Sequence, residues 1–423
     1  MKAMQNRERE SAGQHQGAAM KKGWQTKTLG DLVVVQNGYA FSSKDYSESG
    51  HFLMRIGNVQ NGYISTADTK FIKLPADGSL QRFVLSEDDI LVSLTGNVGR
   101  VGVIQESHLP AALNQRVARI SIRKDSPATR ELLLLFLCSD WFREELIGAG
   151  HGTAQQNVST KDLVEIEIPV PPLVEQQRIV GLLDEAFEGL ATAKANAKKN
   201  LQNARALFES HLKSVFTQCG PGWVETTLGA EIDLLAGFAF KSAQYTNDND
   251  DIRLLRGDNI IQGCLRWEDV KRWPVDDTEE YERYQLEEGD IVLAMDRPWV
   301  KAGLKHATIA ADDLPCLLVQ RTARLRGRAN IDNRFLMLLI GSSAFTSHIL
   351  GVQTGIGVPH ISGQQIKDFE FTRPPIADQR RIADNLESLR EESQCLARLY
   401  ERKLAALEAL KKSLLHQAFS GEL

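Results

Sequence analysis

The side chains of this chain do not fall into the spacings that common catalytic sites require. The 423 residues contain no G-x-x-x-x-G-K-[ST] phosphate loop, no H-E-x-x-H zinc motif and no G-x-S-x-G nucleophile turn. The glycine-rich segment GNVGRVG (Gly96–Gly102) has the wrong spacing for a dinucleotide-binding turn. The Asp/Asn-Pro-Pro-aromatic tetrapeptide of amino-methyltransferases is also absent, although two Pro-Pro pairs occur. The sequence therefore predicts no catalytic residues.

Two further patterns could in principle bind a metal ion. Asp384 with ERK (Glu401–Lys403) has a nuclease-like spacing, but it lies in one predicted helix, whereas nuclease carboxylates normally sit on strands. The five cysteines are scattered without a CxxC pair, which predicts neither a zinc site nor a disulfide framework. They are Cys138, Cys219, Cys264, Cys316 and Cys395. We expect no metal site in this chain.

The composition is that of an ordinary globular protein, with 25% charged and 42% hydrophobic residues. The densest apolar run, LLLLFLC (Leu132–Cys138), is far shorter than the roughly 18 residues a membrane span needs. The first twenty residues carry charges where a signal peptide needs an apolar core. These features predict a cytoplasmic protein without membrane contact. The net charge of −5 gives no global support to nucleic-acid binding.

The elements that would position any site are present twice. GWQTKTLGDLVVVQNGYAFSSKDY (Gly23–Tyr46) matches GWVETTLGAEIDLLAGFAFKSAQY (Gly222–Tyr245) at an offset of 199 residues. The offset drifts to 203 where PPLVEQQRI (Pro171–Ile179) matches PPIADQRRI (Pro374–Ile382). A period near 200 is too long for a solenoid, so each repeat is a globular domain followed by a helix.

Each repeat changes character at its Pro-Pro pair. Before it, short β-rich runs alternate with glycine turns, which indicates a sheet-rich domain. After it, Leu173–Phe216 and Ile376–Phe419 read as long helices. We therefore predict an α+β chain with five segments. They are a flexible tail (1–22), a first domain (23–172), a central helical region (173–219), a second domain (220–373) and a C-terminal helical region (374–423).

Both predicted helices carry apolar residues at spacings of three and four. The expected seams are Ile179, Leu183, Ala186, Leu190, Ala193, Ala197, Asn200, Ala204, Leu207 and His211, and Ile382, Leu386, Leu389, Ser393, Leu396, Tyr400, Lys403, Leu407, Leu410 and Leu414. The first seam is rich in alanine and the second in larger residues, so we expect the helices to pair with each other as an antiparallel coiled coil with pseudo-twofold symmetry. Asn200 and Lys403 either fix the register of this pair or lie at a frayed edge of the contact.

These motifs together resemble the specificity subunit of type I restriction–modification systems. The resemblance is carried by the W-x-x-x-x-L-G opening of each repeat, the PPLxEQ-x-x-I segment before the helix, the ordered duplication and the terminal AFSGEL (Ala418–Leu423). It covers Lys22 to Leu423.

The resemblance implies a non-catalytic subunit that recognises double-stranded DNA. Each globular unit would be a target recognition domain for one half of a bipartite sequence, and the paired helices would set the gap between the halves. Two modification subunits would dock on this scaffold and methylate adenine with S-adenosylmethionine, and restriction subunits with ATP and Mg²⁺ would join them. No cofactor is expected in this chain.

Base contacts are expected where the repeats differ. GNVGRVGVI (Gly96–Ile104) faces DRPWVKAGL (Asp296–Leu304), and GTAQQNVST (Gly152–Thr160) faces TGIGVPHIS (Thr354–Ser362). Gln155, Gln156 and Asn157 have the groups to read adenine, and Arg100 or Arg297 those to read guanine. The full candidate set is Thr95, Asn97, Arg100, Gln155, Gln156, Asn157, Arg297, Lys301, Arg321, Thr354 and His360.

Several of these residues have simpler interpretations. The Gln-Gln-Asn run is also typical of a polar surface loop, and Arg100 and Lys301 suit phosphate contacts better than base reading. RTARLRGR (Arg321–Arg328) fits either a strand edge facing phosphates or an exposed, solvated strand. Arg55 and Arg256 are interpreted as structural ion-pair partners. The aromatic residues Trp24, Phe41, Trp223 and Phe240 are expected in the core.

Three alternative functions are open at this point. The chain could be an unfamiliar nuclease or single-chain methyltransferase, which would need turnover by the chain alone. It could be a coiled-coil scaffold or an antirestriction module that binds protein. It could also serve a related bipartite system in which cleavage and methylation share one partner. The DNA target, the spacer length and any role of residues 1–21 are not predicted.

Overall fold

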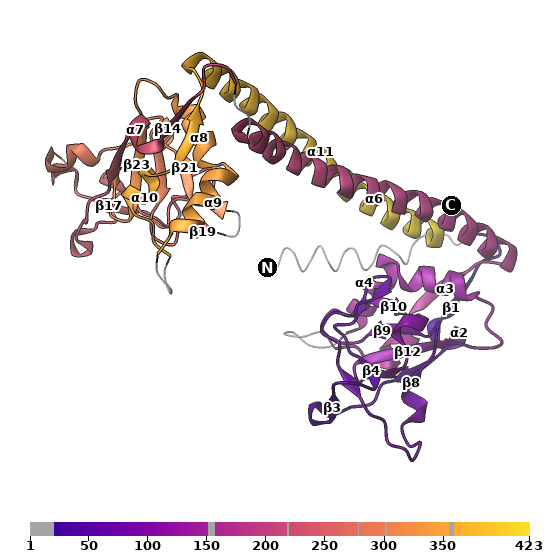
Figure 1. The fold of residues 1–423 in the computed structure, drawn as a ribbon. Coiled ribbons are helices and arrows are strands. Elements are labelled where there is room, and N and C mark those ends of the chain that lie inside the picture. The colour runs from indigo at the N-terminus through magenta and orange to yellow at the C-terminus, as the bar shows by residue number, and fades with distance from the viewer. Residues whose placement is uncertain (1–20, 151–156, 218–219, 278, 301–302, 355–358) are drawn as a thin grey trace. The chain divides into compact units, whose positions relative to one another are not determined.

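The computed structural model describes residues 21–150, 157–217, 220–277, 279–300, 303–354 and 359–423. The chain forms two compact units. Unit 1 comprises 1–197 and 402–423, and unit 2 comprises 198–401. Each unit contains one sheet-rich domain and one segment of each long helix (Figure 1). Both long helices are therefore shared between the two units.

Unit 1 is built on two sheets. The first is four-stranded with the order β10-β9-β12-β2, and the second is five-stranded with the order β3-β7-β4-β11-β8. The strands of the first are β2 (Val33–Asn37), β9 (Ile90–Ser93), β10 (Val101–Val103) and β12 (Val117–Ile122). Those of the second are β3 (Tyr46–Ser47), β4 (His51–Met54), β7 (Phe71–Ile72), β8 (Val84–Leu85) and β11 (Ala111–Leu113). Two separate antiparallel pairs are β1 (Gln25–Thr28) with β13 (Glu167–Val170), and β5 (Val59–Gln60) with β6 (Tyr63–Ile64).

Unit 2 repeats this plan. Its four-stranded sheet has the order β15-β23-β18-β21, and its second sheet has the order β17-β16-β22. The strands are β15 (Ile232–Ala236), β18 (Ile291–Ala294), β21 (His306–Thr308) and β23 (Thr322–Gly327), then β16 (Ile252–Leu255), β17 (Lys271–Trp273) and β22 (Cys316–Leu318). The additional pairs are β14 (Val224–Thr227) with β24 (Glu370–Arg373), and β19 (Trp299–Val300) with β20 (Gly303–Leu304).

Short helices cover the four-stranded sheet in each unit and form the main core with it. They are α2 (Leu29–Leu32), α3 (Arg130–Leu137), α4 (Asp140–Ala149) and α5 (Thr160–Val164) in unit 1, and α7 (Leu228–Glu231), α8 (Asn333–Ile340), α9 (Ser343–Val352) and α10 (Gly363–Lys367) in unit 2. The apolar run LLLLFLC forms most of α3, and Phe136 in it is fully buried. Phe41 and Phe240 are also buried, as predicted, whereas Trp24 and Trp223 are only partly buried.

The two long helices match their predicted ranges closely. They are α6 (Leu173–Thr217) and α11 (Ile376–Ser420). A buried glutamine joins the start of each helix to its globular domain. The Gln176 amide nitrogen donates to the carbonyls of Pro127 and Pro171, and its oxygen accepts from the Thr129 amide, all at 2.8 Å.

Gln379 makes the equivalent bonds to Asn330, Pro374 and Asp332. The second Pro-Pro motif therefore fixes its helix to its domain in the same way. This conserved contact explains why the Pro-Pro-x-x-x-Gln pattern is kept in both repeats.

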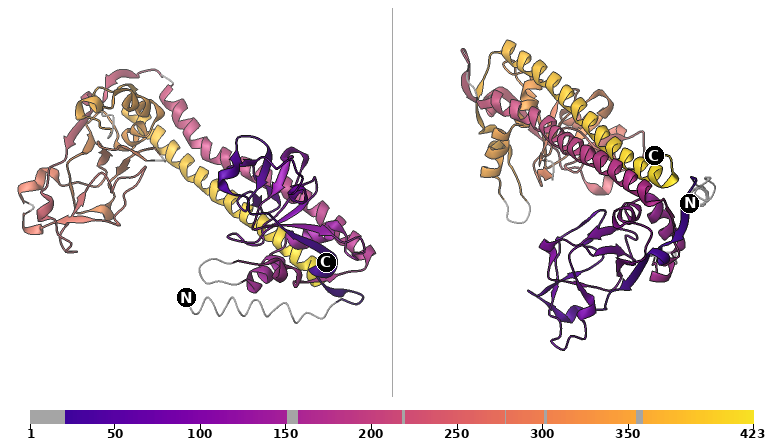
Figure 2. Two further views of the ribbon diagram at one scale, coloured as in Figure 1. Left: turned by 90° about the horizontal axis from the view of Figure 1, so that it is seen from below. Right: turned by 90° about the vertical axis from the view of Figure 1, so that its right-hand side faces the viewer.

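Within each unit the two helix segments run side by side in opposite directions (Figure 2). In unit 1, Lys194 Nζ lies 2.7 Å from Glu408 Oε2, and Lys411 lies over the Phe187 ring at 5.0 Å. In unit 2, Arg205 pairs with Glu401 at 2.7 Å, and Arg390 lies over the Phe208 ring at 4.6 Å. The residue numbers of the partners rise on one helix as they fall on the other, so the predicted antiparallel pairing is confirmed in both units.

The predicted seam of α6 is correct up to Ala197 and at Ala204, and that of α11 is correct up to Ser393. It is wrong at the exposed positions, which are Asn200, Leu207, His211, Leu396, Lys403 and Leu410. Asn200 and Lys403 are exposed, and the neighbouring leucines Leu201 and Leu404 are partly buried instead. Similarly Leu207 is 43% exposed beside the partly buried Phe208, and His211 is exposed beside the buried Leu212. At these positions the buried face lies one residue further along the helix, which fits a helix that turns every 3.6 residues rather than every 3.5. Asn200 and Lys403 therefore do not interrupt the contact.

Candidate nucleic-acid interface

Three segments that are distant in sequence meet at one end of the four-stranded sheet of unit 1. The Leu94 amide donates to the Arg116 carbonyl and the Val158 amide donates to the Leu94 carbonyl, both at 2.9 Å. Next to these bonds, Thr95 and Asn157 form an antiparallel bridge. The segment after β9, the turn before β12 and the segment before α5 are thereby joined. This junction brings together the two loop regions that the sequence comparison identified.

Unit 2 has the same junction. The Met295 amide donates to the Arg321 carbonyl at 2.8 Å, and the Ile361 amide donates to the Met295 carbonyl at 2.9 Å. Asp296 and His360 form the bridge that corresponds to Thr95 and Asn157. The backbone frame is therefore repeated although the side chains on it differ.

The short helices that follow the junction are started in the same way in both units. Ser159 and Ser362 each form a capping box, in which the serine side chain accepts a backbone amide and the third helical residue bonds back to the serine amide. The caps, which lie two residues after Asn157 and His360, fix where α5 and α10 begin. They therefore hold the direction in which these two side chains leave the backbone.

The side chains on the frame of unit 2 form an ionic cluster. The Asp296 carboxylate lies 3.0 Å from Arg321 Nε, and its other oxygen bonds His360 Nδ1. Arg321 is 69% exposed and His360 46% exposed, so both present polar groups at the surface. Thr354 is exposed as well and exchanges backbone hydrogen bonds with His360 at 2.9 and 2.8 Å. Arg297 is exposed, and its amide donates to the Pro359 carbonyl at 2.9 Å.

The predicted residues of unit 1 fall into different environments. Asn157 and Asn97 are exposed and can meet a ligand. Thr95 is only 5% exposed, so its side chain belongs to the frame rather than to the contact surface. Arg100 is half-buried and donates to the Gln60 side chain at 2.8 Å. Gln155, Gln156 and, in unit 2, Lys301 lie outside the described residues.

Sequence analysis overlooked Arg116. It is the counterpart of Arg321. Each of the two residues directly precedes an inner strand of its four-stranded sheet, and its backbone carbonyl accepts the equivalent hydrogen bond, from the amide of Leu94 or Met295. Both have left-handed backbone, with φ of 68° and 66°, and both are exposed. The signal was available in the sequence, because QRVAR (115–119) repeats as QRTAR (320–324).

The basic stretch Arg321–Arg328 is not a strand edge that faces phosphates. Its strand β23 lies inside the sheet, between β15 and β18. Arg324 is 9% exposed and pairs with Asp233, and Arg326 pairs with the buried Asp290 at 2.7 Å. The alternating arginines satisfy acidic groups on neighbouring segments, so only Arg321 from this set belongs to the candidate interface.

Other charged groups have the structural roles expected of them. Arg55 pairs with Asp68 at 2.8 Å, and Arg256 pairs with the equivalent Asp269 at 3.5 Å. Of the nuclease-like set, Asp384 pairs with Arg334 and Glu401 with Arg205, both at 2.7 Å. Among the described residues no group of three or more His, Cys, Asp or Glu side chains is arranged to hold a metal ion.

Comparison with known families matches both repeats separately. The type I restriction–modification DNA specificity domain matches residues 21–202 and 222–402. The chain belongs to this family. It is a type I specificity subunit, as the motifs predicted, and the duplication in its sequence is a duplication of the specificity domain.

Curated relatives of this specificity subunit cover it to different extents. It is 40% identical to the EcoAI specificity subunit of Escherichia coli over 40% of this chain, a match that spans only 28% of that relative. It is 24% identical to the MjaVIII specificity subunit of Methanocaldococcus jannaschii over 99% of this chain and 97% of the relative. The StySPI specificity subunit of Salmonella potsdam is 23% identical, with 96% and 90% coverage.

Solved structures share the fold of the subunit. A chain described in a study of complex assembly and conformational transition of the type I system has a TM-score of 0.73 at 18% identity, covering 96% of this chain and all of that one. The HsdS subunit of Thermoanaerobacter tengcongensis has a TM-score of 0.61 at 19% identity, covering 96% and 98%. Both comparisons support the predicted α+β fold with tandem domains and long helices.

The described helices were also compared with the length and hydropathy of membrane spans. No single one is long and apolar enough to cross a bilayer, and α8 and α9 reach that threshold only as a pair bent by 57°.

Proposed function

We propose that this specificity subunit reads a split, asymmetric DNA sequence, with one half contacted by each unit. The observation that carries the proposal is the repeated junction. The amide bonds from Leu94 and Val158 recur at Met295 and Ile361 with nearly the same lengths, whereas Asn157 is replaced by His360. A shared frame suits docking on a shared backbone, and different side chains suit different bases.

The side chains suggest which contacts are made. In unit 1, the Asn157 amide can both donate to and accept from adenine, with Gln155 and Gln156 as further candidates. In unit 2, Arg297 and His360 offer hydrogen bonds suited to the acceptor edge of guanine. The Asp296 carboxylate positions His360 and Arg321 by bonding both. We assign Arg116 and Arg321 to phosphates, because a position that is the same in both units cannot distinguish the two halves.

Catalysis would reside in partner subunits. We expect two modification subunits to dock on this chain, bind S-adenosylmethionine and flip adenine out of the duplex for methylation. Restriction subunits would bring ATP and Mg²⁺. The specificity subunit would then select the site without taking part in either reaction.

The proposal is tested by sequencing adenine methylation in a host that lacks its own. One strain expresses this chain together with the modification subunit that a neighbouring gene encodes. The control strain expresses the modification subunit alone. A split, asymmetric motif that is modified only in the first strain supports the proposal. Methylation that ignores this chain, or none with a modification subunit proven active with another specificity subunit, contradicts it.

A further inference from the structure

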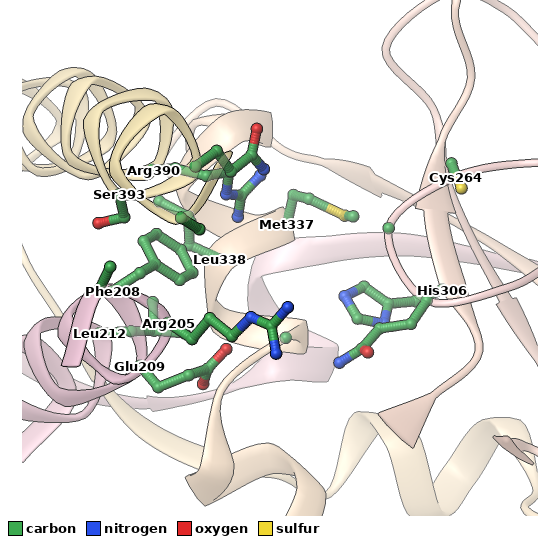
Figure 3. Close-up of a pocket in the computed structure, with 16 residues that line it drawn as sticks. Arg205, Phe208, Glu209, Leu212, Cys264, His306, Met337, Leu338, Arg390 and Ser393 are labelled. Carbon is green, nitrogen blue, oxygen red and sulfur yellow. The ribbon is translucent and has the colours of Figure 1, made fainter. Parts of the chain in front are cut away.

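Unit 2 contains a cavity of about 440 Å³ between its helix segments and its globular domain (Figure 3). All residues that line it belong to 198–401. One wall is apolar and includes Met337 and Leu338 of α8. Polar and charged groups come from three other elements, namely Arg205 and Glu209 of α6, Arg390 and Ser393 of α11, and His306 of β21. We call this space the helix cavity. Its size is in the range of small-molecule sites.

The Ser393 hydroxyl has no hydrogen-bond partner although the residue is only 5% exposed. A buried hydroxyl without a partner is unfavourable by roughly 1–3 kcal/mol. Ser393 lines the helix cavity, but its hydroxyl oxygen has almost no accessible surface and points away from Met337 and His306 (Figure 3), so a ligand there can satisfy it only if the Ser393 side chain rotates.

His306 supplies a hydrogen-bond acceptor at the helix cavity. It is 5% exposed, and its Nδ1 donates to the Leu304 carbonyl at 2.9 Å, because a carbonyl can only accept. Burial lowers the pKa of His306, and the charge of Arg390 lowers it further against the raising effect of the Leu304 carbonyl. The imidazole is therefore neutral, with Nε2 available as an acceptor.

Arg390 places a positive charge at the cavity, which the carboxylate of Glu209 also lines. Its guanidinium lies over the Phe208 ring at 4.6 Å, and within the described part of the chain no carboxylate pairs with it. The other guanidinium on the wall, that of Arg205, is already paired with Glu401 at 2.7 Å. A planar guanidinium with free donors suits a phosphate or carboxylate.

The repeat provides an internal comparison. In unit 2, His306 of β21 lies opposite Leu293 of β18. In the equivalent strand pair of unit 1, Val101 of β10 lies opposite Val92 of β9. Val101 is therefore the counterpart of His306. The helix offset of 203 makes Leu190 the counterpart of Ser393 and Phe187 that of Arg390. All three polar groups are thus replaced by apolar residues in unit 1. The polar lining is therefore not required to build this fold.

We propose that the helix cavity binds a small amphipathic oxyanion, that is, an aromatic or aliphatic body carrying one phosphate or carboxylate group. The anionic group is held by Arg390, and by the Ser393 hydroxyl once that side chain rotates toward the cavity. The apolar body packs on Met337 and Leu338, and a donor on the ligand bonds His306 Nε2. This inference goes beyond DNA reading and does not depend on it.

The test titrates the full chain, in complex with its modification subunits, with phenyl phosphate and with phenylacetate, followed by calorimetry or ligand-observed NMR. We expect saturable binding of at least one of them in the millimolar range or tighter, as is usual for ligands of this size. Inorganic phosphate and benzyl alcohol, which are the isolated head and body, should bind about tenfold more weakly because each makes only part of the contacts. Tighter binding of phenyl phosphate or of phenylacetate shows whether the site prefers a phosphate or a carboxylate group.

Variants locate the site. Arg390→Gln should weaken binding by about tenfold, the usual scale for losing a charged hydrogen-bond donor. The double change His306→Val with Ser393→Leu, which introduces the residues of unit 1, should abolish it. The matched control is Lys411→Gln, which removes the cation that lies over Phe187 in unit 1 and should leave the affinity unchanged.

Three results would overturn the proposal. They are the absence of saturable binding by both aromatic anions, equal affinity for inorganic phosphate alone, and equal loss in the Arg390→Gln and Lys411→Gln variants. Circular dichroism and thermal unfolding of each variant separate loss of the site from loss of the fold. Arg390→Lys keeps the charge and should retain part of the affinity.

Discussion

Glycine and arginine residues at equivalent positions in the two units shape the backbone of the candidate interface. A Cβ on Gly38 would lie 2.0 Å from the Asn114 carbonyl oxygen, and one on Gly237 would lie 2.1 Å from that of Val319. These glycines allow the chain before the second sheet to pass directly over the turn that leads to Arg116 or Arg321. The glycines thus control the placement of the arginines that we assign to phosphate contacts.

Replacing Gly38 by alanine should therefore destabilise unit 1 by about 3 kcal/mol, because the backbone must move to remove the clash. Thermal or denaturant unfolding of the purified chain measures the change. The control is Gly57→Ala, where a Cβ has no neighbour within 4 Å, and its effect should stay within about 0.5 kcal/mol. Similar effects of the two changes would contradict this account of Gly38.

Arg116→Ala should weaken DNA binding by the assembled methyltransferase to a similar extent for all sequences. Loss of one phosphate contact lowers the slope of log affinity against log salt by about 1. The control is Arg130→Ala, which removes a cation that pairs with Asp88 near the other end of β9. A changed preference at one base pair, with an unchanged salt slope, would show that Arg116 reads a base instead.

Gln176 and Gln379 connect the long helices by hydrogen bonds to the domains that carry the candidate interface. Each buried amide satisfies two carbonyls and the amide of the residue that caps α3 or α8. The start of the long helix, the end of the sheet-rich domain and the first covering helix are thus connected by one side chain. Movement of the helix is thereby coupled to movement of the domain.

Gln176→Ala should destabilise unit 1 by about 3 kcal/mol, since it leaves buried backbone groups without partners. Its neighbour Gln177 is exposed and serves as the matched control, for which we expect an effect within about 0.5 kcal/mol. Hydrogen exchange at the Thr129 amide reports the same bond locally. Unchanged protection of that amide in Gln176→Ala would contradict this role.

Sequence patterns predicted the elements better than their contacts. The bounds of α6 and α11 could be predicted because glycine nearly disappears and apolar residues recur after each Pro-Pro pair. The seam prediction fails at Asn200, Leu207 and His211, because each is followed directly by an apolar residue, Leu201, Phe208 or Leu212, that is buried or partly buried instead. The junction could not be predicted either, because the residues that form it, Leu94, Arg116 and Val158, are distant in sequence. Hydrophobic periodicity gives no information on such long-range contacts. The buried pairing of Arg324 likewise depends on a strand order that the sequence does not specify.

At the scale of the whole molecule, charge limits what the chain can do alone. Residues 23–170 contain 14 basic and 17 acidic residues, and residues 222–373 contain 17 and 23. The affinity of most DNA-binding proteins depends on basic groups that neutralise phosphates. The modification subunits are therefore expected to supply much of the positive surface that holds the duplex.

The isolated chain should consequently bind DNA weakly, with a Kd no tighter than about 1 µM at physiological salt. Fluorescence anisotropy with a duplex that contains the methylation motif measures this affinity, and a scrambled duplex is the control. Addition of the modification subunit should tighten binding by at least about a hundredfold. Nanomolar, sequence-specific binding by the chain alone would contradict this division of the binding energy.

The central claim is that each unit recognises one half of the DNA motif. Its most direct test is a domain exchange followed by sequencing of methylated adenines. Residues 23–170 are replaced by the matching segment of a specificity subunit with a different target, and the rest of the chain is kept. The account predicts that one half of the methylated motif changes while the other half and the spacing between them are retained. A motif altered in both halves, or an unaltered motif from an active complex, would show that the two units do not read the halves separately.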